Sequence, residues 1–160
     1  MALSRTGTMF FGDPAAAFAN IARAIGPDGR LAMLVWQGPA ANEWIRELTG
    51  ALAAGRDLPA PPAGSPGPFA QADPEAARAV LAAAGFTRIT IDGLRRPMWF
   101  GADAEDALAF VLGLMGWMLD GLDDAGRSRA LRNLRATVNA HEGGHGVCYD
   151  SATWMITATR

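Results

Sequence analysis

Six consecutive apolar residues, Leu31 to Trp36, form the clearest pattern in the chain. The run is shorter than a typical helix, and Gln37-Gly38-Pro39 ends it. It therefore predicts a strand that is covered on both faces, as in a parallel sheet. Gly26-Pro27-Asp28-Gly29 precedes the run as a tight turn, in which Gly29 can take a positive φ. A helix, a turn and a buried strand in this order indicate the αβ half of an α/β unit.

Five helices are predicted where apolar residues recur at helical spacing behind a residue that can cap a helix. The expected ranges are 14–25, 43–52, 74–84, 104–119 and 124–138. The residues that can cap them are Asp13, Asn42, Asp73, Asp103 and Asp123. Asp106, three residues after Asp103, resembles the second half of a capping box. The last two helices follow each other and form a helical insertion before the final strand.

Further strands are predicted on both sides of the buried run. Ala2-Leu3-Ser4 reads as the end of a strand, and Ile89 and Ile91 alternate with polar residues in another. Arg96 to Phe100 extends as an edge segment, because Pro97 has no backbone N–H to donate to a neighbour. Ala152 to Ala158 is the final strand. The chain therefore predicts one α/β domain over residues 1–160.

The segment from Gly55 to Pro68 is rich in proline and glycine, which excludes helix and central strand. It predicts a long, partly extended loop, and such loops often act as lids. The abundance of alanine, glycine, proline and arginine is typical of a GC-rich bacterial genome.

Charge and cysteine content limit the partners. The net charge is −2 and the 14 basic residues are dispersed, so we expect no nucleic-acid partner and no polybasic membrane patch. Cys148 is the single cysteine and belongs to no thiol motif, which fits a reducing cytoplasm. The longest apolar stretch, near Ala107 to Leu119, is shorter than the roughly 20 residues that span a bilayer. We therefore expect a soluble, cytoplasmic protein.

One motif matches the pattern of zinc peptidases, His141-Glu142-Gly143-Gly144-His145. That chemistry needs both histidines on one face of a helix, with the glutamate acting on a metal-bound water. The two central glycines cost such a helix about 2 kcal/mol relative to alanines. We therefore expect a helix terminus and a loop here and no metal site. A zinc hydrolase stays the remote alternative.

Several segments in order resemble a known family. They are Ser4-Arg5-Thr6-Gly7-Thr8-Met9-Phe10-Phe11-Gly12-Asp13-Pro14, Trp36-Gln37, Asn42-Glu43-Trp44, Gly67-Pro68-Phe69 and Leu81-Ala82-Ala83-Ala84-Gly85-Phe86. Their order and spacing resemble the C-terminal half of a class I S-adenosylmethionine-dependent methyltransferase over nearly the whole chain. Thr6 departs from that pattern, which usually has a phenylalanine at this position.

The resemblance implies a partial Rossmann-like methyltransferase sheet with strands five, six and seven and a stub of strand four. The glycine-rich cofactor loop of the N-terminal half is missing. S-adenosylmethionine is the implied cofactor, and a small molecule is the implied methyl acceptor. Residues implied to lie on the cofactor side are Ser4, Arg5, Thr6 and Gly7. Residues implied to line the acceptor pocket are Met9, Phe10, Trp36, Gln37, Asn42 and Trp44.

A truncated sheet also has consequences for association. An apolar strand without its neighbour exposes backbone donors and acceptors and an uncovered face. We therefore expect a homodimer near this edge, or pairing with a chain that supplies the missing half. Besides a methyltransferase portion, the sequence leaves open a non-catalytic remnant that serves as a binding or dimerisation module.

Overall fold

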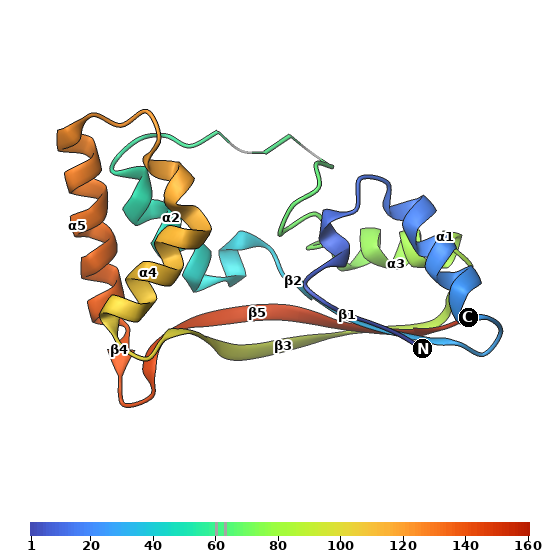
Figure 1. The fold of residues 1–160 in the computed structure, drawn as a ribbon. Helices are drawn as coiled ribbons and strands as arrows, with labels where there is room; N and C mark the ends of the chain where they lie inside the picture. Colours follow the sequence, from blue (N-terminus) through green and yellow to red (C-terminus); the bar gives the residue numbers. More distant parts are fainter. Residues whose placement is uncertain (60, 63) are drawn as a thin grey trace. The chain divides into compact units, whose positions relative to one another are not determined.

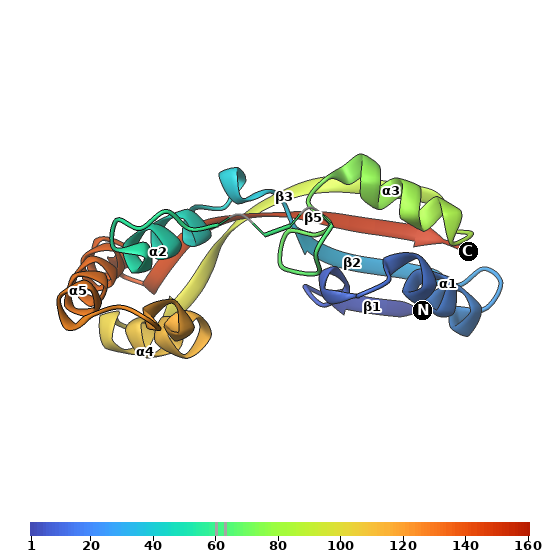
Figure 2. The ribbon, with the colours of Figure 1, turned by 90° about the horizontal axis from the view of Figure 1, so that it is seen from above.

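The apolar run lies in the middle of a mixed sheet. The computed structural model describes residues 1–59, 61–62 and 64–160. Strand β2 (Arg30–Trp36) pairs in parallel with β1 (Ala2–Arg5) and antiparallel with β5 (Gly146–Thr159). Strand β3 (Thr87–Gly101) follows β5, so that the order is β1-β2-β5-β3 (Figures 1 and 2). The predicted strands are confirmed, and β3 lies at the edge where Pro97 requires it.

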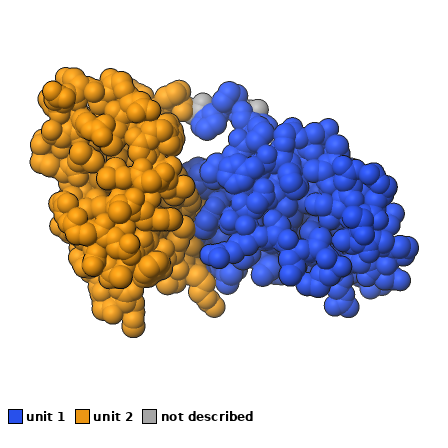
Figure 3. All heavy atoms as spheres, viewed as in Figure 1, with its two compact units in different colours: residues 1–41, 61–95, 152–160 blue, residues 42–60, 96–151 orange. Residues whose placement is uncertain are grey.

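The chain divides into two compact units, coloured separately in Figure 3. Unit 1 contains Met1–Ala41, Pro61–Arg95 and Ala152–Arg160, and unit 2 contains Asn42–Ala60 and Arg96–Ser151. Strands β3 and β5 contribute residues to both units. One domain over residues 1–160 stays a prediction.

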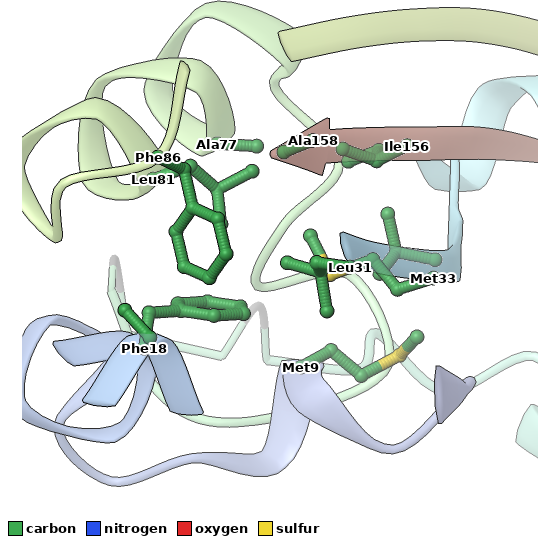
Figure 4. Close-up of a cluster of buried hydrophobic side chains, with 11 residues drawn as sticks. Met9, Phe18, Leu31, Met33, Ala77, Leu81, Phe86, Ile156 and Ala158 are labelled. Atoms are coloured by element: carbon green, nitrogen blue, oxygen red, sulfur yellow. The ribbon is translucent and has the colours of Figure 1, made fainter. Parts of the chain in front are cut away.

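In unit 1, helices α1 (Pro14–Ile25) and α3 (Pro74–Ala83) lie on the same side of the strands (Figure 1). Leu31, Met33 and Val35 face this side and are buried. Figure 4 shows the aromatic rings of Phe18 and Phe86 pointing toward each other beside Leu31 and Met33. The core of unit 1 therefore lies between one layer of helices and one face of the sheet.

The prediction that this strand is covered on both faces is wrong for the described part of the chain. Ala32 and Leu34 alternate with the buried residues of β2 and are only half-buried. Leu3 of β1, which pairs with Ala32, is 72% exposed. The apolar pattern of β2 would suit a layer of helices on each face of the sheet. Both helices that belong to unit 1 lie on a single side instead.

Unit 2 is mainly helical. Helices α2 (Glu43–Ala53), α4 (Ala104–Met115) and α5 (Asp124–Ala140) bury Leu48, Val111 and Leu134. The hairpin of β4 (Glu142–Gly143) with β5 follows α5. The predicted helical insertion before the last strand is confirmed. Of the described helices, none is long and apolar enough to cross a membrane.

Four of the five predicted caps form. The side chains of Asp13, Asp73, Asp103 and Asp123 each accept a backbone N–H in the first turn of their helix. Asn42 occupies the fifth cap position, but its side chain makes no capping bond, which corrects the prediction. Its Oδ1 accepts a hydrogen bond from Trp44 Nε1 instead, at 3.2 Å.

Two further local predictions need correction. The α-helix expected to reach Leu119 ends at Met115, and Gly116–Leu119 continues as a 3₁₀ turn. In the turn before β2, the residues with a positive φ are Gly26, at 72°, and Asp28, at 56°. Gly29 does not have a positive φ. Gly29 is needed for another reason, because a Cβ there would lie 2.7 Å from the carbonyl oxygen of Ile25.

Candidate functional site

The carboxyl ends of β1 and β2 lie side by side in unit 1. The strands are parallel neighbours, and Arg5 at the end of β1 pairs with Leu34 near the end of β2. The backbone N–H of Thr6 donates to the carbonyl oxygen of Leu34 at 2.9 Å, so the loop after β1 begins against β2. In open α/β sheets, ligands bind outside the carboxyl ends of parallel strands. This edge is therefore the candidate site.

The predicted cofactor-side residues and two of the predicted acceptor residues, Trp36 and Gln37, lie at the ends of these strands. Ser4 and Arg5 end β1, Thr6 and Gly7 form the loop after it, and Trp36 ends β2. Thr6 has a φ of 54°, which for a β-branched residue costs about 1 kcal/mol or more. Such strain persists where the surrounding structure holds it in place, often at a functional site.

Gln37, the first residue after β2, holds this end of the sheet together. Its backbone N–H donates to the carbonyl oxygen of Ala152 at 3.0 Å, and its Nε2 donates to that of Thr153 at the same distance. The Gln37 amide group also lies against Gly93 of β3, where an added Cβ would meet Nε2 at 3.3 Å. The side chain predicted to contact the acceptor is thus engaged with β5.

A buried polar network fastens the proline-rich loop to the segment after β1. Thr8 Oγ1 donates to Gln71 Oε1 at 2.9 Å, and Gln71 Nε2 donates to the Thr8 carbonyl oxygen at 3.2 Å. Both side chains are buried. The N–H of Gly67 donates to the Met9 carbonyl oxygen, and Trp154 Nε1 donates to that of Ala72. The end of the loop is thereby held over the 3₁₀ turn of Thr8–Phe10.

The sequence pattern does not predict this hydrogen-bond network. Gln71 lies in an irregular segment, where periodicity carries no information about burial, and its partner Thr8 is 63 residues away. The nearby Gly67-Pro68-Phe69 motif was the only local signal. Of the predicted long loop from Gly55 to Pro68, residues 60 and 63 lie outside the described residues, and the others are neither helix nor strand.

Two predicted acceptor residues differ in exposure. Met9 is 1% exposed and packs in the core of unit 1, whereas Phe10 is 56% exposed. A small cavity of about 60 Å³ in unit 1 is lined by Phe18, Met33 and Gln71, among others. Phe10 is therefore open to a ligand in this arrangement, and Met9 acts as core.

Asn42 and Trp44 belong to unit 2. Asn42 is fully buried, and the ring of Trp44 lies 6.3 Å from that of Phe100. Both side chains contribute to packing at the start of α2. The other eight predicted site residues belong to unit 1.

The zinc-peptidase motif does not form a helix. Helix α5 ends at Ala140, and Glu142 and Gly143 form β4, so His141 and His145 do not share a helical face. His141 stacks on Tyr149 with ring centroids 3.9 Å apart, and its Nδ1 lies 2.7 Å from the Thr137 carbonyl oxygen. Within the described part of the chain, no three His, Cys, Asp or Glu side chains are arranged to hold a metal ion.

No protein-family model and no curated protein match this chain. Among solved structures, a presumed methyltransferase from Bacillus halodurans C-125 is similar, with 10% sequence identity and a TM-score of 0.49. The match covers 99% of this chain and 63% of that protein. The chain therefore spans less than two thirds of the length of this neighbour.

Proposed function

We propose that this chain is the C-terminal portion of a class I S-adenosylmethionine-dependent methyltransferase that acts on a small molecule. The observation that carries the proposal is the parallel pairing of β1 with β2, in which Ser4 pairs with Met33 and Arg5 pairs with Leu34, shortly before Trp36 and Gln37. These are the segments in which the sequence resembles the family. Their meeting at the carboxyl edge of a sheet fits a ligand site.

The sheet order supports this assignment. In doubly wound sheets the fourth and fifth strands are parallel neighbours joined by a helix. Strand β1, α1 and β2 have this arrangement, which fits a stub of strand four followed by strand five. We assign β3 and β5 as strands six and seven, with the helical insertion between them.

Two features of unit 1 support a missing half. Strand β1 ends the sheet, and no described strand pairs with its outer edge. Leu3, Leu34 and Met155 line an open hollow of about 230 Å³ on the face without helices. A segment that adds strands beside β1 and helices on this face would satisfy both. We propose that such a segment, in another chain or a second copy, completes the site.

The residues of this chain fit only part of a cofactor site. S-adenosylmethionine supplies a sulfonium-bound methyl group, and its ribose hydroxyls are usually held by an acidic side chain. None of the ten predicted site residues is acidic, and the glycine-rich loop is absent from the sequence. We therefore propose that this chain supplies the acceptor side of the site and only part of its cofactor side.

A non-catalytic binding module is the second candidate, and the same lack of an acidic residue favours it. Isothermal titration of S-adenosylmethionine separates the two. Saturable binding at one site per chain, weakened by Arg5→Gln and unchanged by the exposed control Arg132→Gln, supports a methyltransferase. Absence of binding heat, while circular dichroism shows a folded chain, contradicts cofactor binding by this chain alone and supports the module.

The proposal that a half is missing has an independent test. Sequencing the DNA upstream of the codon for Met1 would show whether an in-frame glycine-rich segment precedes it. Its presence supports a methyltransferase portion. Non-coding DNA there, and no adjacent gene with such a segment, would contradict a missing half.

A further inference from the structure

Three arginine residues line one hollow at the end of unit 1 opposite the candidate site. Arg30 begins β2, Arg160 follows β5 and Arg88 lies near the start of β3, so that three neighbouring strands each contribute one. They line one hollow of about 240 Å³, which we call the arginine hollow. Its lining residues are Asp28, Arg30, Thr87, Arg88, Thr159 and Arg160.

The backbone at this end keeps the strands in place. The N–H of Arg160 donates to the Gly29 carbonyl oxygen at 2.9 Å, and Arg30 pairs with Thr159. Thr87 Oγ1 donates to the Thr159 carbonyl oxygen at 3.2 Å. The hollow is therefore built on paired strands, and its positions do not depend on a free loop.

Arg88 has an unusual backbone for its residue type. Its φ is 48°, a left-handed conformation that costs an L-residue about 1–2 kcal/mol. The side chains of successive residues in a regular strand point to opposite faces, yet Thr87 and Arg88 both line the hollow. The left-handed conformation of Arg88 interrupts this alternation, so that Thr87 and Arg88 can both line the hollow.

Within the described residues, these three guanidinium groups form no ion pair with a carboxylate. Arginine is charged at every physiological pH, so three like charges around one hollow repel one another. Asp28 is the acidic residue among the residues that line the hollow. An anion with several acceptor oxygens would relieve the repulsion.

We propose that the arginine hollow binds a phosphoryl group of a small molecule. A planar carboxylate offers two oxygens, whereas a terminal phosphoryl group offers three that diverge and carries close to two negative charges. Three guanidinium groups from three strands suit the second geometry. The hydroxyl groups of Thr87 and Thr159 donate to the backbone of the neighbouring strand, so the guanidinium groups are the donors of this site. The site does not depend on the proposed methyltransferase function.

The test is a titration of the protein with sodium pyrophosphate at constant ionic strength. Binding is measured from the amide chemical shifts in ¹H–¹⁵N spectra. We expect saturable shifts at Arg88, Thr159 and Arg160. Arg88→Gln or Arg30→Gln should weaken binding about tenfold, because each removes a charge-assisted hydrogen bond. Asp28→Asn should tighten it, and the exposed control Arg132→Gln should leave it unchanged.

Three outcomes would overturn the proposal. One is equal shifts with sodium chloride at the same ionic strength, which would indicate screening alone. Another is unchanged pyrophosphate affinity in both Arg88→Gln and Arg30→Gln. The third is tighter binding of malonate than of pyrophosphate, which would indicate a site for a dicarboxylate and not for a phosphoryl group. Circular dichroism confirms that each variant is folded.

Discussion

Tyr149 is the residue whose ionisation is most clearly altered by burial. Its side chain is 1% exposed, and its hydroxyl lies 3.4 Å from Thr137 Oγ1. Burial raises the pKa of Tyr149, and the charges of Glu47 and Glu43 raise it further, while the Thr137 bond lowers it. The folded-state pKa therefore lies above the unfolded value of about 10.

This shift predicts a pH dependence. The neutral phenol stabilises the folded chain fully below about pH 10, and this contribution is lost as the pH rises through the folded-state pKa. Tyr149→Phe should remove that part of the alkaline loss of stability. Urea unfolding of both proteins between pH 8 and 11 measures it. Parallel alkaline slopes in the two proteins would contradict the prediction.

Gln71 is the residue that joins the segment after the proline-rich loop to the 3₁₀ turn of Thr8–Phe10. Gln71→Ala leaves the Thr8 hydroxyl and carbonyl groups without their buried partner. We expect the free energy of unfolding to fall by about 1–3 kcal/mol. The exposed control Asn20→Ala should change it by less than about 0.5 kcal/mol. Urea denaturation measures both, and equal effects would show that the network contributes nothing.

Among the helices, the caps of α3 and α2 allow a direct comparison. The Asp73 carboxylate accepts the N–H groups of Glu75 and Ala76, whereas Asn42 caps nothing with its side chain. Asp73→Ala should lower the free energy of unfolding by about 1 kcal/mol, and Asp73→Asn should lose much less. Chemical denaturation measures the difference. If alanine and asparagine behave alike, the carboxylate oxygen is not acting as a cap.

The same helices show how far local pattern determines an element. Aspartate followed by proline begins both α1 and α3 as expected, because the carboxylate and the missing N–H suit a first turn. Asn42 follows the same rule by position, but the indole of Trp44 takes its oxygen. Where a side chain has two possible hydrogen-bond partners, only the tertiary structure decides which of them it binds.

For the molecule as a whole, the uncovered apolar face of unit 1 is the feature that predicts association. Leu3, Leu34 and Met155 are apolar and lie where no described helix covers them. We expect the chain to bind the dye ANS and to self-associate at micromolar concentration. Leu34→Thr combined with Met155→Thr should reduce both, and Leu58→Thr in the exposed loop should not. Fluorescence and sedimentation velocity measure these effects, and a monomer that does not bind ANS would contradict them.

The sequence by itself determined the local elements: the strand at Leu31 to Trp36, the helix starts, the edge position of Pro97 and the end of a helix at the zinc-peptidase motif. Short-range sterics and capping decide these features, so neighbouring residues suffice to predict them. Tertiary structure alone decided the strand order, the Thr8–Gln71 network, the division into two units and the gathering of three arginines. These depend on contacts between residues far apart in the chain, on which local periodicity has no bearing.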